Sequence, residues 1–255
     1  MAVHKAKTIT ITSVKGGVGK TTTTLNLAGI FSLMKKRVLI MDLDLYGGAI
    51  ATSLNISNEK DIYKLIDDLS NNRFNVIEDY VIKYNDMIDV IPAPKDPRFA
   101  NKINSRYLDI VIDRASMKYD VILIDTNHIL NEINLVTLDA SDEIVYVISN
   151  DPVDLKNMKS MVSIFKDMNK DNYKIVLNNA KDKLRNYFSK HDIKNIIKDN
   201  VDYIIPTDFY LRNFDFYTLE GDILTLNKKI RNNEKKSIKI FEMIAESLIK
   251  TNGGE

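Results

Sequence analysis

The chain has 255 residues, a formal net charge of +1, 44% hydrophobic residues and no cysteine. This size and balance are typical of a soluble α/β domain with a large core. The lack of cysteine excludes disulfides and cysteine–metal sites, and the near-neutral charge gives no electrostatic argument for a nucleic-acid partner. Residues 1–7 contain no apolar signal core, and no run approaches the length of a membrane span. We therefore expect a cytoplasmic protein.

Short apolar, β-branched runs alternate with longer helical patterns along the chain. The segments Val38-Leu39-Ile40-Met41 and Val121-Ile122-Leu123-Ile124 are apolar without alternation, which is typical of parallel strands buried on both faces. The repeated βα order predicts an α/β fold: a doubly wound, mostly parallel sheet with helices on both faces. No linker interrupts the pattern, so we expect one domain over residues 1–255, with a disordered tail at 252–255. The expected strands are 8–14, 37–42, 87–92, 119–125, 143–149, 173–178 and 203–206, and the expected helices include 22–34, 61–69, 103–117, 155–168 and 192–198.

A glycine-rich segment separates the first expected strand from the first expected helix. Glycines allow backbone N–H groups to close around phosphate oxygens, and a helix N-terminus adds a favourable dipole. Lys20 is placed to reach the β- and γ-phosphates, and the Thr21 hydroxyl is placed to hold Mg²⁺. A surface loop rich in glycine and lysine is the competing interpretation, but the order of strand, loop and helix favours a nucleoside triphosphate site. The predicted nucleotide-binding segment is Lys15, Gly16, Gly17, Val18, Gly19, Lys20, Thr21 and Thr22.

Polar residues end several of the expected strands, where ligands bind in such sheets. Asp125 closes a buried strand in a Walker B pattern, and its carboxylate is a candidate for holding Mg²⁺ through the water shell of the ion. Asp42 and Asp44 are separated by one residue at the end of the second strand, so both carboxylates could face the same side if the strand continued. One could then lie near Mg²⁺ while the other orients the attacking water. Capping of the turns that follow is the alternative role for all three carboxylates.

The loop departs from the general P-loop pattern in two ways, because Val14 replaces a glycine and Lys15 adds an early lysine. The resulting K-G-G-x-G-K-T sequence resembles the deviant Walker A motif of the MinD/ParA family of ATPases. The resemblance implies that Lys15 crosses a dimer interface to the nucleotide of the partner subunit. It also implies that Asp44 positions water for hydrolysis and that Asp42 lies closer to the metal. Lys15, Lys20 and Asp44 are then the expected catalytic residues, and Thr21, Asp42 and Asp125 the expected Mg²⁺ residues.

The same resemblance assigns adenine contacts to Asn178, Pro206 and Asp208. An amide supplies both a donor and an acceptor to a base edge, although an ordinary turn residue is the alternative for Asn178. The chain departs from the family after Asp125, where Thr126-Asn127-His128 replaces the usual proline and glycine. We expect His128 to be a hydrogen-bonded loop residue and not an acid–base group, since water-driven phosphoryl transfer does not require one.

Weaker sequence matches outside the loop resemble the CpaE/TadZ-like branch of the family, whose members help to place Tad-type pili. They include Asp42-Leu43-Asp44-Leu45 with Gly47-Gly48-Ala49, and Ile91-Pro92-Ala93-Pro94. The resemblance implies an ATP-dependent homodimer that binds ATP or ADP with Mg²⁺, hydrolyses ATP slowly and positions a pilus, flagellar or division machine through a protein partner. One alternative is a ParA-type partition ATPase that binds DNA without sequence preference. Another is a nucleotide-binding scaffold with little turnover.

The C-terminal region joins a basic segment to an amphipathic pattern. Lysines and arginine gather at 228–231 and 235–239, and apolar residues at helical spacing follow from Ile238 to Leu248. Recruitment to the inner face of the membrane is one interpretation of this pattern. Glu242 and Glu246 disfavour it, because a membrane helix needs a strongly basic polar face. We therefore expect a final helix packed against the core.

Overall fold

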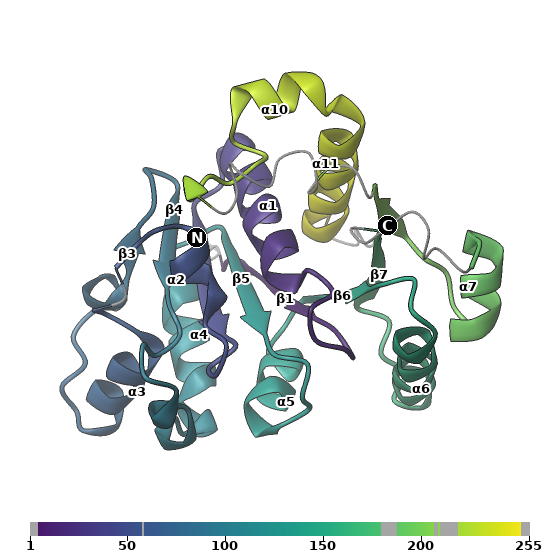
Figure 1. The fold of residues 1–255 in the computed structure, drawn as a ribbon. Coiled ribbons are helices and arrows are strands. Elements are labelled where there is room, and N and C mark those ends of the chain that lie inside the picture. The colour runs from purple at the N-terminus through teal and green to yellow at the C-terminus, as the bar shows by residue number, and fades with distance from the viewer. Residues whose placement is uncertain (1–4, 58, 180–187, 207–208, 210–218, 251–255) are drawn as a thin grey trace, which may run out of the picture.

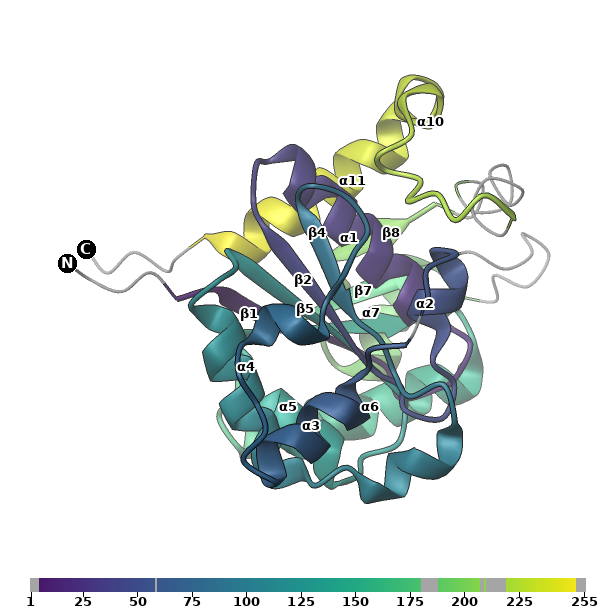
Figure 2. The same ribbon diagram turned by 90° about the vertical axis from the view of Figure 1, so that its left-hand side faces the viewer.

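The computed structural model describes residues 5–57, 59–179, 188–206, 209 and 219–250. Within these residues one eight-stranded sheet has the order β3-β4-β2-β5-β1-β6-β7-β8. All neighbouring strands are parallel except β3 and β4. Helices cover both faces of the sheet (Figures 1 and 2), so the predicted fold class is confirmed. The strands are β1 (Lys7–Thr12), β2 (Val38–Leu43), β3 (Ile82–Lys83), β4 (Ile88–Ile91), β5 (Val121–Thr126), β6 (Glu143–Ile148), β7 (Tyr173–Asn178) and β8 (Tyr203–Ile205).

The two faces of the sheet carry different sets of helices. The residues of α1, α2, α10 and α11 pack in one cluster with one face, and those of α3 to α7 pack against the other. The helices are α1 (Lys20–Leu33), α2 (Ala49–Ser53), α3 (Ile62–Ser70), α4 (Leu108–Ser116), α5 (Glu132–Asp139), α6 (Pro152–Asp167), α7 (Lys190–Ile197), α10 (Lys228–Asn233) and α11 (Lys235–Ile249), with short 3-10 turns η1 (Ile77–Tyr80), η2 (Pro97–Lys102) and η3 (Ser105–Tyr107).

Strand β2 explains why the apolar runs do not alternate. Val38 and Ile40 belong to the cluster that contains α1 and α11, whereas Leu39 and Met41 belong to the cluster that contains α3 and α4. All four side chains are fully buried. Burial of each such side chain contributes about 1.5–3 kcal/mol, so a polar residue on either side of this strand would be costly. A continuous apolar run is the sequence that this position requires.

The central strands bring the expected site residues to one edge of the sheet. β1 lies between β5 and β6, and β5 in turn lies beside β2. The later strands therefore lie on both sides of β1, with β5 and β2 on one side and β6 on the other. Open α/β sheets bind ligands at such a switch point in the strand order. In the β2–β5 register Asp42 is the direct partner of Asp125.

The final helix is packed against the core, as expected. Ile238, Phe241, Ile244, Ala245 and Leu248 on α11 are all buried in the cluster that contains α1. The Phe241 ring lies 5.4 Å from the ring of Phe209, measured between centroids. Among the described helices, none combines the length and the apolar character that crossing a membrane requires.

Several element boundaries differ from the expected ones for local reasons. α6 begins three residues earlier than expected because Asp151 accepts hydrogen bonds from the backbone N–H groups of the first turn, with proline in the next position. α7 begins earlier because Ser189 forms a capping box. The expected helix at 103–117 is wrong in its first turn, where the Asn104 side chain caps a separate 3-10 turn. β3, α2 and α10, with two, five and six residues, are too short to produce a periodic pattern.

Candidate nucleotide site

The backbone between β1 and α1 has the conformation of a phosphate-binding loop. Gly17 and Gly19 have φ values of 73° and 98°, which lie in the left-handed region. A Cβ on Gly19 would also lie 2.3 Å from Nδ2 of Asn178. Gly16 and Gly17 are exposed, and α1 begins directly at Lys20. The loop thus presents backbone N–H groups at a helix N-terminus, where an anion is favoured.

Asn178, at the end of β7, fixes this loop from the neighbouring strand. Its Nδ2 donates a hydrogen bond of 2.8 Å to the Val18 carbonyl. Its Oδ1 is buried and has no partner within the part of the chain that the structure describes, so an acceptor remains beside the loop. Pro206 follows β8, the next strand of the sheet, and is half-buried. Asp208 lies outside the described residues.

Thr21 and Asp125 are brought together, as a Mg²⁺ site requires. The Thr21 hydroxyl donates to Oδ2 of Asp125 over 2.6 Å, and the Thr24 hydroxyl lies 3.4 Å from the other carboxylate oxygen. Burial raises the pKa of Asp125 to about 7, although the Thr21 hydrogen bond and the Lys20 charge oppose the shift. The Lys20 charge therefore compensates the burial of this carboxylate only in part. The Thr21 hydroxyl and the Asp125 carboxylate are oxygen ligands of the kind that Mg²⁺ prefers, so these residues would fit the ion.

Asp42 is fully buried and organises the loop that follows β2. One carboxylate oxygen accepts from the backbone N–H of Asp44, and the other accepts from the backbone N–H of Ile50, both over 3.1 Å. Burial, and then the charge of Asp125, raise the pKa of Asp42 well above its usual range. The described residues contain no group of three His, Cys, Asp or Glu that could hold a metal. A metal ion here would therefore also need the Thr21 hydroxyl and oxygens of a ligand.

Asp44 is half-buried in a tight turn close to both other carboxylates. Its Oδ1 accepts from the Gly47 N–H over 3.2 Å, and its backbone oxygen accepts from the N–H groups of Gly47 and Gly48. Its charge raises the pKa of both Asp42 and Asp125. The turn is tethered by the Tyr46 hydroxyl, which donates to Oδ1 of Asn101 over 2.6 Å. No sequence pattern identifies this tether, because its two residues lie 55 positions apart.

The Lys15 side chain forms an ion pair at the start of α6. Its Nζ lies 3.0 Å from Oδ1 of Asp151, the capping residue of α6, and Lys15 lowers the pKa of that carboxyl. Asp151 was not among the expected site residues. The Asp-Pro pair marks it only as a helix start, and its closeness to Lys15 follows from the packing of α6 against β6, which is the neighbour of β1 in the sheet.

The segment after Asp125 is held by Asn134 and not by His128. The Asn134 Nδ2 donates to the carbonyl oxygens of Asn127 and Ile129. The His128 side chain is exposed and faces Gly16, where a Cβ would lie 3.4 Å from the ring. The expected hydrogen bond of His128 is absent among the described residues.

Comparisons with known proteins identify the family and the fold of the chain. A family model described as "AAA domain" matches residues 6–178. The sporulation initiation inhibitor protein Soj of Bacillus subtilis is 29% identical over 62% of this chain and 64% of its own, less than two thirds of its length. A ParA family ATPase from Chlorobium tepidum has a similar structure, with a TM-score of 0.79 at 20% identity over 94% of this chain and 98% of the other. The septum site-determining protein MinD from Pyrococcus horikoshii, complexed with Mg-ADP, has a TM-score of 0.77 at 24% identity over 96% of each chain. At these identities the two structures show a shared fold.

Proposed function

We propose that this chain binds ATP with Mg²⁺, dimerises and hydrolyses ATP slowly. The chain belongs to the MinD/ParA family of P-loop ATPases, within the AAA domain family. The observation that carries the proposal is the 2.6 Å hydrogen bond between Thr21 and Asp125 at the start of α1. It joins the glycine-rich loop to the Walker B strand in one site. The relative of known structure that is complexed with Mg-ADP supports the choice of nucleotide and metal.

Each residue of the site has a distinct role in binding. The loop backbone, with Gly17 and Gly19 in left-handed conformations, surrounds the phosphates. Lys20 would neutralise phosphate charge, and Thr21 and Asp125 would hold Mg²⁺, which would supply charge stabilisation for phosphoryl transfer. The unpartnered Oδ1 of Asn178 can accept a hydrogen bond from an amino group of the base.

Hydrolysis depends on Asp44 and on Lys15 from a second copy. Asp44 orients the attacking water, a role that contributes by positioning and does not require proton abstraction. Its place beside Asp42 and Asp125 supports this assignment. Lys15 from the partner subunit would add positive charge opposite Lys20 once two copies meet face to face. Hydrolysis then releases the dimer.

The output that we propose is positional, meaning that the ATP-bound dimer recruits or places a partner protein. The resemblance of the loop after β2 to the CpaE/TadZ-like branch favours a pilus or flagellar base, with recruitment to the inner face of the membrane. The names of the relatives include sporulation, partition and division proteins instead. The finer role therefore rests on the sequence cues alone.

Partition with DNA binding is the second candidate function. It is favoured by the relatives named for chromosome partitioning and by the exposed lysines Lys228, Lys229, Lys235 and Lys236 on α10 and α11. Contacts to phosphates make DNA affinity fall steeply with salt. DNA binding by the ATP-bound dimer that weakens strongly between about 50 and 200 mM salt would favour partition over placement of an appendage.

Calorimetric titration with ATP and Mg²⁺ tests the proposed function. The Lys20→Ala variant should bind ATP about 10- to 100-fold more weakly, because it loses charge-assisted hydrogen bonds to phosphate. Lys194→Ala, an exposed lysine on α7, is the matched control. Lys20 is only 8% exposed, so circular dichroism should accompany the titration. A folded Lys20→Ala protein with unchanged ATP affinity would contradict the proposal.

A further inference from the structure

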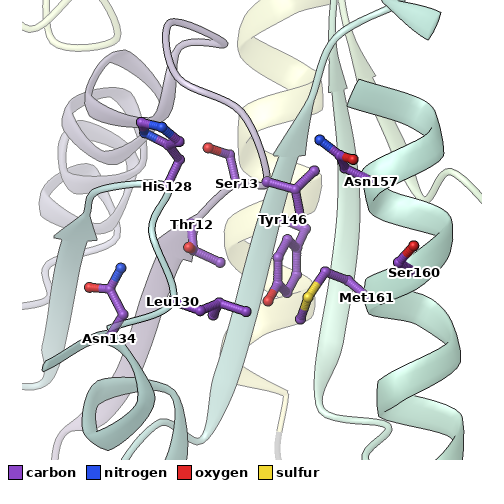
Figure 3. A pocket seen from close by; sticks show the side chains of 10 residues that line it. Thr12, Ser13, His128, Leu130, Asn134, Tyr146, Asn157, Ser160 and Met161 are labelled. Carbon is purple, nitrogen blue, oxygen red and sulfur yellow. The ribbon is translucent and has the colours of Figure 1, made fainter. Parts of the chain in front are cut away.

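A cavity lies beside the P-loop, between the segment that follows β5 and helix α6. Its volume is about 290 Å³. Thr12 of β1 and Tyr146 of β6 contribute from the sheet, Leu130 and Asn134 from the chain after β5, and Ser160 and Met161 from α6 (Figure 3). Leu130 and Ser160 are exposed, so the cavity opens to solvent between the loop and α6. None of the residues to which we assign nucleotide or metal binding lines it.

Tyr146 places an unused hydroxyl at this cavity. The residue is only 1% exposed, and its Oη has no hydrogen-bond partner within the described part of the chain. Its ring is fixed by an edge contact with Phe165, with 5.5 Å between centroids. In Figure 3 the hydroxyl end of the ring points toward the side where Leu130 and Met161 lie. A buried hydroxyl without a partner costs about 1–3 kcal/mol, and a ligand in the cavity would recover this cost.

Asn134 lines the same cavity and is held in one orientation. Its Nδ2 is fully engaged with Asn127 and Ile129, which fixes the orientation of the amide. Its Oδ1 is buried and has no partner among the described residues. In Figure 3 this oxygen points away from the side of Tyr146, so the unused polar group that the cavity offers is the Tyr146 hydroxyl, which can donate or accept.

The remaining lining determines the class of ligand. Val14, Leu130 and Met161 supply apolar surface, and no Asp, Glu, Lys or Arg lines the cavity among the described residues. Ser13, His128 and Asn157 supply the other polar groups of the lining. A charged molecule would lose hydration there without gaining a carboxylate, ammonium or guanidinium group as its counter-charge. A cavity of about 150 Å³ is sufficient to bind benzene, so this volume holds one ring and a polar substituent. We propose that this cavity binds a small uncharged molecule with a one-ring apolar body and a hydroxyl or carboxamide group that pairs with Tyr146.

The position of the cavity connects such a ligand to the segment after Asp125. Leu130 lies in this segment, and Asn134 holds the segment in place through its Nδ2. A bound molecule would contact both residues on one side and Met161 of α6 on the other. It would therefore stabilise one arrangement of the segment, and binding itself requires neither nucleotide nor hydrolysis.

Methyl NMR of the full chain labelled with ¹³C-methyl methionine tests the proposal directly. The probes are phenol, toluene and benzoate. Phenol and toluene should give a saturable shift of the Met161 signal, and the signal of the exposed Met117, which follows α4, should stay in place. Benzoate should bind at least about tenfold more weakly than phenol because of its charge. A cavity that holds only water would give no saturable shift at Met161, and that result would overturn the proposal.

The Tyr146→Phe variant tests the hydrogen bond. It removes a hydroxyl that has no partner among the described residues, so the fold should be retained. Phenol affinity should fall about three- to tenfold, the size of one hydrogen bond, whereas toluene affinity should change by less than about twofold. Equal losses for both probes would show that the hydroxyl does not bind ligand. As a second variant, Ser160→Phe places a ring at the exposed opening and should weaken both probes, and an unchanged affinity for both would place them outside this cavity.

Discussion

The ammonium group of Lys15 lies 3.0 Å from the carboxylate of Asp151, the residue that caps the N-terminus of α6. Both side chains are about 40% exposed, and ion pairs of this kind contribute about 0–1 kcal/mol. In the proposed dimer Lys15 would have to exchange this carboxylate for phosphate oxygens of the partner subunit. The contact is weak enough to be exchanged, and it competes with dimerisation.

Replacing Asp151 with asparagine should therefore favour the dimer. The amide keeps a capping acceptor for the first turn of α6, while the charge that attracts Lys15 is removed. We expect about two- to fivefold tighter ATP-dependent dimerisation, measured by sedimentation velocity. Asp171→Asn, at an exposed position, serves as the control for net charge. Weaker or unchanged dimerisation of Asp151→Asn would mean that the ion pair does not compete.

The Lys15→Ala variant separates binding from dimerisation. Lys15 is engaged with α6, so the monomer should bind ATP with an affinity within about twofold of wild type. The variant should stay monomeric with ATP in light scattering, because the positive charge that reaches the second nucleotide is lost. If Lys15→Ala dimerises and turns over normally, this chain does not use a lysine that acts across subunits.

The Asp44→Ala variant should bind ATP but hydrolyse it at least about 100-fold more slowly, since water positioning is lost. Dimers should then accumulate with ATP, which phosphate release and sedimentation would measure together. Asp42→Asn is the matched comparison. Because Asp42 is buried and holds two backbone N–H groups, we expect that variant to lower the melting temperature. Wild-type turnover by Asp44→Ala would transfer the catalytic role to Asp42 or to a partner protein.

The sequence predicted the parts of the site that follow from strand order. Asp42 and Asp125 end parallel strands, so the pattern of strands was enough to place them at the same edge of the sheet, where β2 and β5 make them neighbours. The contact of Asn178 with Val18 and the pairing of Lys15 with Asp151 could not be predicted, because they depend on how the loop lies against β7 and α6. Local capping by Asn104 also moved one helix start, since a side chain competed with the helical backbone pattern.

Asp68 gives the fold a pH dependence that is independent of the nucleotide site. Its carboxylate accepts hydrogen bonds from Lys64, Arg73 and Tyr80, and these, with Lys64 first, lower its pKa from 3.8 to about 2. Because the folded pKa is below the unfolded one, this carboxylate stabilises the fold above about pH 4, and the contribution disappears as pH falls toward about 2.

Asp68→Asn should therefore lose about 1 kcal/mol of stability at about pH 6. The loss is small because solvent screens the charges of the exposed lysine and arginine partners. The difference from wild type should shrink between about pH 4 and about pH 2.5. Urea denaturation of both proteins at these three pH values measures it, and Asp171→Asn provides a control carboxylate. A difference that stays the same from the highest to the lowest pH would mean that the hydrogen bonds to Asp68 do not depend on its charge.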